Sequence, residues 1–152
     1  MILSKGDFVM EKFVVWEDRY SVGIKEINDQ HKKLVDFTNI LFESCRHGLD
    51  EANETFSKTL QEAVDYVNIH FTYEEKIMQQ LNYPQYLQHK QAHQSFVQKV
   101  IEEATAFKEG KKFVPNSFVR FLKDWLLEHI AIQDQDLGIF LKAEVQKRKK
   151  QN

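Results

Sequence analysis

The sequence contains one cysteine, two prolines and five glycines among its 152 residues. Cys45 has no second cysteine to pair with, so the fold must be held by packing or by metal, and a lone thiol favours a reducing, cytoplasmic compartment. The few prolines and glycines leave the long periodic segments uninterrupted. We therefore expect an almost entirely helical chain.

An excess of one charge and long apolar runs are also missing. A net charge of −2, from 21 Lys plus Arg against 23 Asp plus Glu, provides no basic field for nucleic acid. No stretch approaches the length of a membrane span, and the N-terminus carries charges where a signal peptide needs apolar residues. The length suits one domain with its own core. We expect a single cytoplasmic domain that binds neither nucleic acid nor a membrane.

Apolar residues recur at helical spacing in four segments, which run from about residue 27 to 46, 51 to 81, 86 to 107 and from 115 onward. Gly48, the Asn82–Pro84 turn and Gly110 separate these segments. The stripe of the last segment comprises Phe118, Leu122, Trp125, His129 and Ile132. Four helices with short connections pack as an all-α, up-down-up-down antiparallel four-helix bundle.

Five of the six histidines and two carboxylates interrupt the apolar stripes. His70 and Glu74, like His89 and His93, lie one helical turn apart and therefore share a helix face. Alternating helix directions bring all four segments' polar positions to the same end of the bundle. The candidate metal ligands are His31, His70, Glu74, His89, His93, His129 and Asp134.

The number of these groups indicates two metal ions. A tetrahedral zinc takes about four ligands. Two bridging carboxylates and five imidazoles would fill about nine of the roughly twelve positions of two octahedral ions, and a solvent oxygen bridge would leave about one open. Imidazole and carboxylate suit iron, zinc, copper or nickel, so the ligand types alone do not select the metal.

The alternative is that these are ordinary core histidines, which is the commoner case for any one of them. Taken together, they would leave many buried polar atoms unsatisfied, at about 1 to 3 kcal/mol each, against a marginal total stability. The joint pattern therefore favours metal binding.

Several motifs resemble those of the bacterial hemerythrins, with their HHE-type cation-binding domain. The matching runs are Trp16–Ile24, Gln30-His31, His70-Phe71-x-x-Glu74-Glu75, Tyr83-Pro84 with His89 and His93, and Trp125-Leu126-x-x-His129-Ile130-x-x-x-Asp134. The resemblance covers roughly residues 13 to 140. We expect a domain over residues 13–146, an N-terminal arm over residues 1–12 and a basic tail over residues 147–152, with Met10 as an alternative start.

The resemblance implies a non-heme, oxo-bridged di-iron site that binds dioxygen reversibly. Carried over by position, His31 and His70 would hold the iron with the open position. The other iron would be held by His89, His93 and His129, and the bridges would be Glu74 and Asp134. It also implies a dry pocket, whose walls would be Leu34, Phe71, Trp125 and Leu126, although these residues also suit a plain core role.

Two features depart from the family pattern or from an ideal helix, and one further glutamate, Glu75, could be mistaken for a ligand. Asn28 stands where the family often has Asp, which leaves its influence on the ligands open. The five-residue gap between His129 and Asp134 rotates the two by about 140° on an ideal helix, which predicts a distortion or helix end near Ile132 or Gln133. Glu75 points away from the stripe and is expected at the surface or behind a ligand.

The leading functional interpretation is storage, transport or delivery of dioxygen, without enzymatic activity. One alternative is oxygen or iron sensing through a protein partner, which is disfavoured by a length that suits a stand-alone domain without a fused signalling domain. The other is a ferritin-like di-iron oxidase, which would use two Glu-x-x-His motifs that this chain does not contain in that arrangement.

Overall fold

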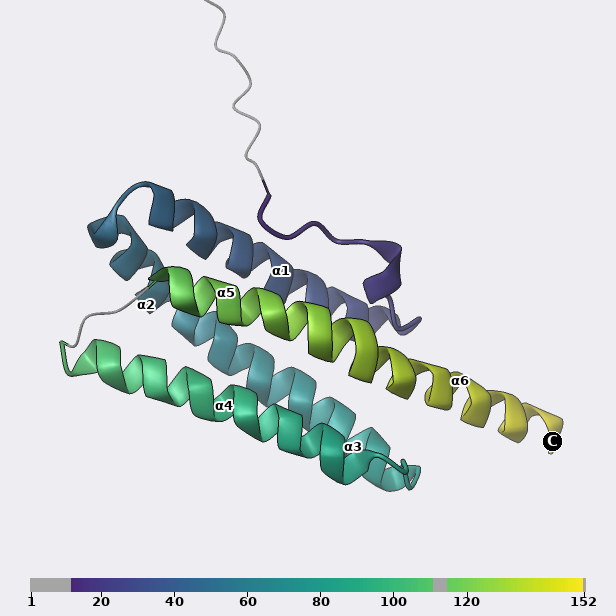
Figure 1. Cartoon of the computed structure of the whole chain (residues 1–152). Helices are drawn as coiled ribbons and strands as arrows, with labels where there is room; N and C mark the ends of the chain where they lie inside the picture. The colour runs from purple at the N-terminus through teal and green to yellow at the C-terminus, as the bar shows by residue number, and fades with distance from the viewer. Residues whose placement is uncertain (1–11, 111–114, 152) are drawn as a thin grey trace, which may run out of the picture.

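A computed structural model describes residues 12–110 and 115–151, and the long elements within them are four helical rods of alternating direction (Figure 1). The first rod is α1 (Lys25–Arg46), and the third is α4 (Tyr86–Lys108). The second rod runs without a break through α2 (Leu49–Tyr66), η2 (Val67–Phe71) and α3 (Thr72–Gln80). The fourth runs through α5 (Pro115–Trp125), η3 (Leu126–Asp134) and α6 (Gln135–Lys150). The structure confirms the all-α four-helix bundle.

The turns between rods lie at residues that tolerate left-handed backbone. Gly48 after α1 has φ 109°, and Gly110 after α4 has φ 68°. Asn82, between α3 and α4, has φ 53°, a conformation that asparagine adopts more readily than most side chains. These short reversals make neighbouring rods antiparallel, so that α1 packs against α2 and α5, and α3 packs against α4.

Two π-helical segments, η2 and η3, lie inside the second and fourth rods. The chain continues through the predicted distortion, which is a π-helix from Leu126 to Asp134 and not a helix end. A π turn contains more residues than an α turn, so the phase of every later residue changes. Ile132, expected in the buried stripe, is therefore 58% exposed, whereas Ile130 is fully buried. The expectation for Ile132 was wrong for this reason.

Apolar residues gather in two clusters along the bundle. The larger cluster joins all four rods and includes Leu34, Phe56, Phe96 and Leu122. The smaller comprises Met78 on α3, Tyr83 at the α3–α4 turn, and Leu137 and Leu141 on α6. Along the second and fourth rods, the predicted ligands fall between these two clusters. The fold therefore encloses the polar positions with apolar layers on both sides.

The segment before α1 is fastened to the bundle by side-chain amides. Asn39 of α1 accepts a hydrogen bond from the backbone N–H of Val14 and donates one to its carbonyl, both at 2.8 Å. The Asn28 side chain accepts a hydrogen bond from the N–H of Val22 at 2.9 Å and donates one to Oγ of Ser21 at 2.8 Å, so its polar atoms hold this segment and not a predicted ligand. Gln135 donates to backbone carbonyls around the short helix η1 (Asp18–Tyr20). The predicted arm lies, except for Lys12, outside the described residues.

The C-terminal turns of α6 extend beyond the bundle (Figure 1), and the basic run 147–150 is exposed there. Over the described ranges, no helix has both the length and the apolar character needed to cross a membrane.

Candidate metal centre

The seven predicted ligands meet at one level inside the bundle. Their exposed fractions are all between 0 and 2%. Every rod contributes: α1 provides His31, the second rod provides His70 and Glu74, α4 provides His89 and His93, and η3 provides His129 and Asp134. The sixth histidine, His47, is exposed at the end of α1 beside Glu43 and does not join the cluster.

The histidines form two groups around two shared carboxylates. Glu74 and Asp134 lie with His31 and His70 in one group, and the same two carboxylates lie with His89, His93 and His129 in the other. In each group, one ligand atom per residue lies within 4.8 Å of all the others. This division matches the two sets of ligands that the resemblance implies.

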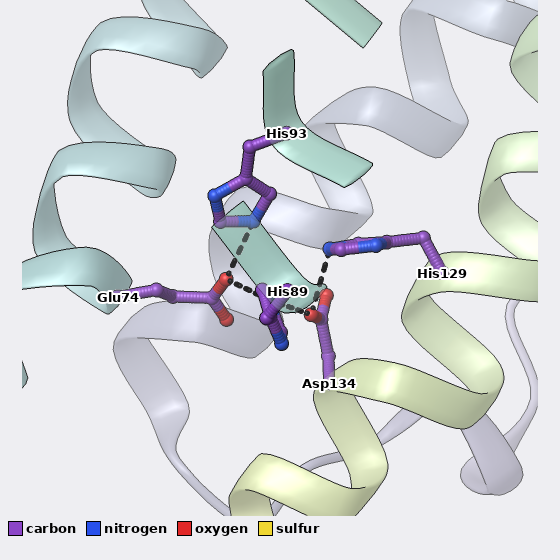
Figure 2. A group of neighbouring side chains, drawn as sticks. All are labelled: Glu74, His89, His93, His129 and Asp134. Atoms are coloured by element: carbon purple, nitrogen blue, oxygen red, sulfur yellow. Dashed lines mark hydrogen bonds and ion pairs between the residues drawn. The ribbon is translucent and has the colours of Figure 1, made fainter. Parts of the chain in front are cut away.

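Asp134 faces both groups with different oxygens. Its Oδ2 atom lies 2.9 Å from Nε2 of His31. Its Oδ1 atom lies 3.1 Å from Nε2 of His89 and 3.0 Å from Nε2 of His129, as Figure 2 shows for the second group. A carboxylate in this position has one oxygen available to each group.

Glu74 reaches the histidines of the second and third rods with one oxygen. Oε2 lies 3.2 Å from Nε2 of His89 and 3.3 Å from Nε2 of His93 (Figure 2), and 3.5 Å from Nε2 of His70. The other oxygen, Oε1, is buried and has no hydrogen-bond partner within residues 12–110 and 115–151.

Most of these short separations lack hydrogen-bond geometry. Nε2 of His93 and of His129, and both oxygens of Asp134, also have no hydrogen-bond partner in the described part of the chain. Buried polar atoms are almost always satisfied, and these point toward shared space instead of toward one another. Imidazole nitrogen and carboxylate oxygen are common ligands of transition metals. The cluster is therefore able to hold metal.

Burial and mutual charge change the pKa values in the metal-free cluster. Burial raises the pKa of Glu74, as does the charge of Asp134, but contacts with His70, His89 and His93 outweigh both and lower it to about 2. Burial lowers the pKa of His89, and the two carboxylates outweigh burial and raise it to about 9. Without metal, the carboxylates are charged and protons on some histidines compensate for them.

Two of the candidate ligands, His70 and His93, are oriented by hydrogen bonds on the side of the ring that faces away from the cluster. The Nδ1–H of His70 donates to Oε1 of Gln30 at 2.8 Å, and the Nδ1–H of His93 donates to Oε1 of Glu75 at 3.1 Å. Each contact fixes the tautomer that leaves the Nε2 lone pair directed into the cluster. Sequence spacing did not identify Gln30, because its contact crosses from α1 to η2.

The expected pocket residues are all buried, and two of them contact the cluster directly. Phe71 stacks on His93, with ring centroids 3.8 Å apart, and Trp125 stacks on His129 at 4.0 Å. These aromatic rings therefore cover the three-histidine group. Leu34 and Leu126 are 0% and 2% exposed and belong to the larger apolar cluster.

Tyr66 is a residue of the site that sequence reasoning missed. Its ring stacks on His70 with centroids 4.8 Å apart, and its hydroxyl is buried. Burial raises the pKa of the hydroxyl well above its ordinary value, and the charges of Asp134 and Glu74 raise it further. Tyr66 lies one helical turn before His70, so the spacing alone could have placed it on the helix face of this ligand.

A helical bundle with a buried cluster of histidines and carboxylates defines a class of metal-binding protein. Residues 22–138 match the family model described as the hemerythrin HHE cation binding domain. The chain belongs to the hemerythrin family.

Individual relatives agree with this assignment. A hemerythrin-like protein of Naegleria gruberi is 33% identical over 119 residues, which cover 78% of this chain and 86% of that protein. A bacteriohemerythrin of Stenotrophomonas maltophilia is 30% identical over 132 residues, or 87% of this chain and 84% of the relative. A crystal structure of wild-type hemerythrin superposes with a TM-score of 0.72 at 28% identity, covering 83% of this chain and 95% of the other.

Proposed function

We propose that the cluster binds two iron ions and that the protein binds dioxygen reversibly there, for oxygen storage, transport or delivery and without catalysis. The observation that carries this proposal is the arrangement of seven buried ligands in two groups that share Glu74 and Asp134. One metal ion would leave one of these groups unsatisfied inside the core.

In this proposal, His31 and His70 hold one ion, and His89, His93 and His129 hold the other. Glu74 and Asp134 would serve both ions, which is supported by the short distances of each carboxylate to histidines of both groups. Bound iron would supply the electrons for dioxygen binding and recover them on release.

The surrounding residues would keep the site dry and rigid. Leu34, Phe71, Trp125 and Leu126 are buried, and Phe71 and Trp125 stack on His93 and His129, which supports a role in limiting the entry of water that promotes irreversible oxidation. Gln30 and Glu75 would hold the ligating rings in place from outside.

Metal analysis together with optical spectroscopy tests the proposal. We expect two irons per chain, and the reduced protein should gain visible charge-transfer bands in air and lose them when oxygen is removed. A single tightly held zinc without visible absorption would refute the di-iron assignment. Bands that cannot be reversed by removing oxygen would refute reversible binding. His89→Ala is expected to lower iron content, while the exposed change Gln94→Ala should retain it.

A further inference from the structure

Tyr66, the last residue of α2, carries a buried hydroxyl beside the two-histidine group. The side chain is 6% exposed, and its ring stacks on His70 with an interplanar angle of 21°. The same ring contacts Phe71 and Phe96, so neighbours from the second and third rods hold it in place. A phenol held this rigidly keeps its hydroxyl in one location.

The hydroxyl of Tyr66 has no hydrogen-bond partner among residues 12–110 and 115–151. The indole N–H of Trp125 also has no hydrogen-bond partner there, and it lies near enough to the phenol to lower its pKa. An indole nitrogen only donates, so it can approach the phenol oxygen but cannot accept the phenol hydrogen. The O–H of Tyr66 therefore lacks an acceptor in the described fold, which is rare for a buried group.

We propose that the Tyr66 hydroxyl donates a hydrogen bond to a small ligand bound at the His31–His70 end of the cluster. The ligand class is a dioxygen-derived or anionic molecule of two or three atoms with an accepting oxygen or nitrogen. The inference rests on the proposed function, because such a ligand needs a metal ion to bind. Tyr66 is then a positioning and specificity residue, and sets which small ligands the site prefers.

Three arguments favour this role over plain core packing. Phenylalanine would provide the same stacking on His70 and the same contact with Phe96 without burying a hydroxyl. The ring that carries the hydroxyl stacks on His70, and the charges of Asp134 and Glu74 add to burial in raising the pKa of the phenol, so the hydroxyl lies within electrostatic reach of the cluster. The ring lies on the histidine group to which the family pattern assigns the open position.

Azide binding to the oxidised, iron-loaded protein tests the inference, and Tyr66→Phe is the variant. Loss of a hydrogen bond to an anion should weaken azide binding about tenfold. The infrared stretch of bound azide should shift between H2O and D2O in the wild type and shift less in Tyr66→Phe. The matched control is Tyr73→Phe, which removes a hydroxyl from a partly exposed tyrosine on α3 and should leave both readouts unchanged.

Metal-free protein provides a readout that does not depend on iron. Because the Tyr66 hydroxyl has no acceptor in the fold, Tyr66→Phe should unfold at the wild-type temperature or above it. A clearly lower melting temperature would show that the fold itself satisfies the hydroxyl, and would overturn the inference.

The outcomes separate the two proposals. If wild-type protein binds azide and Tyr66→Phe binds it equally well with the same isotope shift, the inference fails and the proposed function stands. If the wild type takes up no iron or shows no azide-dependent absorption, the proposed function fails and the inference fails with it. Weakened binding with a diminished isotope shift and an undiminished metal-free melting temperature supports the inference.

Discussion

At the scale of the residue, the centre depends on which nitrogen of each histidine faces inward. Gln30 and Glu75 accept from the Nδ1–H groups of His70 and His93, so both residues fix Nε2 as the metal-facing atom. Glu75 is itself held by an ion pair with Lys90 at 3.5 Å. The orientation of His70 and His93 is therefore set by residues one layer outside the cluster.

Truncating Glu75 should weaken metal binding without removing a ligand. In Glu75→Ala, His93 loses the acceptor that fixes its tautomer, and we expect the metal affinity to fall by about 10- to 100-fold. Competition with a chelator measures this change. Glu102→Ala, which truncates an exposed glutamate on α4, the helix of His93, is the control and should leave the affinity unchanged. Equal affinities in both variants would show that the contact behind His93 is unimportant.

The metal-free protein should be most stable near pH 6.5. Burial lowers the pKa of His89, but Asp134 and Glu74 outweigh burial and raise it to about 9. The stability that protonated His89 contributes is therefore complete below the unfolded pKa of 6.5, and it is lost as the pH rises through 9. Burial lowers the pKa of His31 and His93, so their contribution is present above 6.5 and falls with decreasing pH.

Urea unfolding of metal-free protein between pH 5 and about pH 10 measures this profile. His89→Gln should flatten the decline on the alkaline side, because the titrating group is removed. A wild-type profile that rises steadily from pH 6.5 to 9 would contradict the raised pKa of His89.

At the scale of the element, the helices were predictable and their internal distortions were not. Glycines and the Asn82–Pro84 turn marked the rod ends, and apolar spacing marked the buried faces, because both are local properties. A prediction from spacing assumes about 100° per residue, which fails inside η2 and η3. The five-residue gap between His129 and Asp134 indicated a distortion but not its type or length. The contacts of Gln30 and Tyr66 depend on the packing between rods, which spacing within one rod does not describe.

Two isoleucines of η3 test the π-helical register directly. Ile130 is fully buried and Ile132 is 58% exposed, whereas the α-helical stripe predicted Ile132 to be buried. Ile130→Ala should therefore destabilise the protein by about 2 to 5 kcal/mol, because it leaves a cavity in the core. Ile132→Ala should change the free energy of unfolding by at most about 0.5 kcal/mol.

Denaturant unfolding of the two variants at constant metal occupancy provides the comparison. The substitutions are chemically identical and lie two residues apart, so each serves as the control for the other. A larger loss for Ile132→Ala than for Ile130→Ala would restore the α-helical register and refute the π-helix in this segment.

At the scale of the whole molecule, the cluster joins all four rods at one level between two apolar layers. Above and below the cluster, apolar packing alone is enough to favour the bundle. At the level of the cluster, the described fold leaves several buried nitrogens and oxygens without hydrogen bonds. Without metal, this level must retain charge and protons in the core, so it is the part of the bundle expected to loosen first.

Removing the metal should therefore lower the stability of the entire bundle. Metal that binds only the native state adds about 2.7 kcal/mol when its free concentration is a hundred times its dissociation constant. For a domain of this size, that corresponds to a rise in melting temperature of roughly 5 to 10 °C. Calorimetry of metal-free and reloaded protein measures the difference, and reloading should restore the original melting temperature.

Since the ligands come from every rod, His31→Ala in α1 and His129→Ala in η3 should each diminish this rise in melting temperature, although they lie on different rods. Unchanged melting temperatures on metal removal, or a shift retained in full by both variants, would show that these buried histidines do not stabilise the bundle through metal.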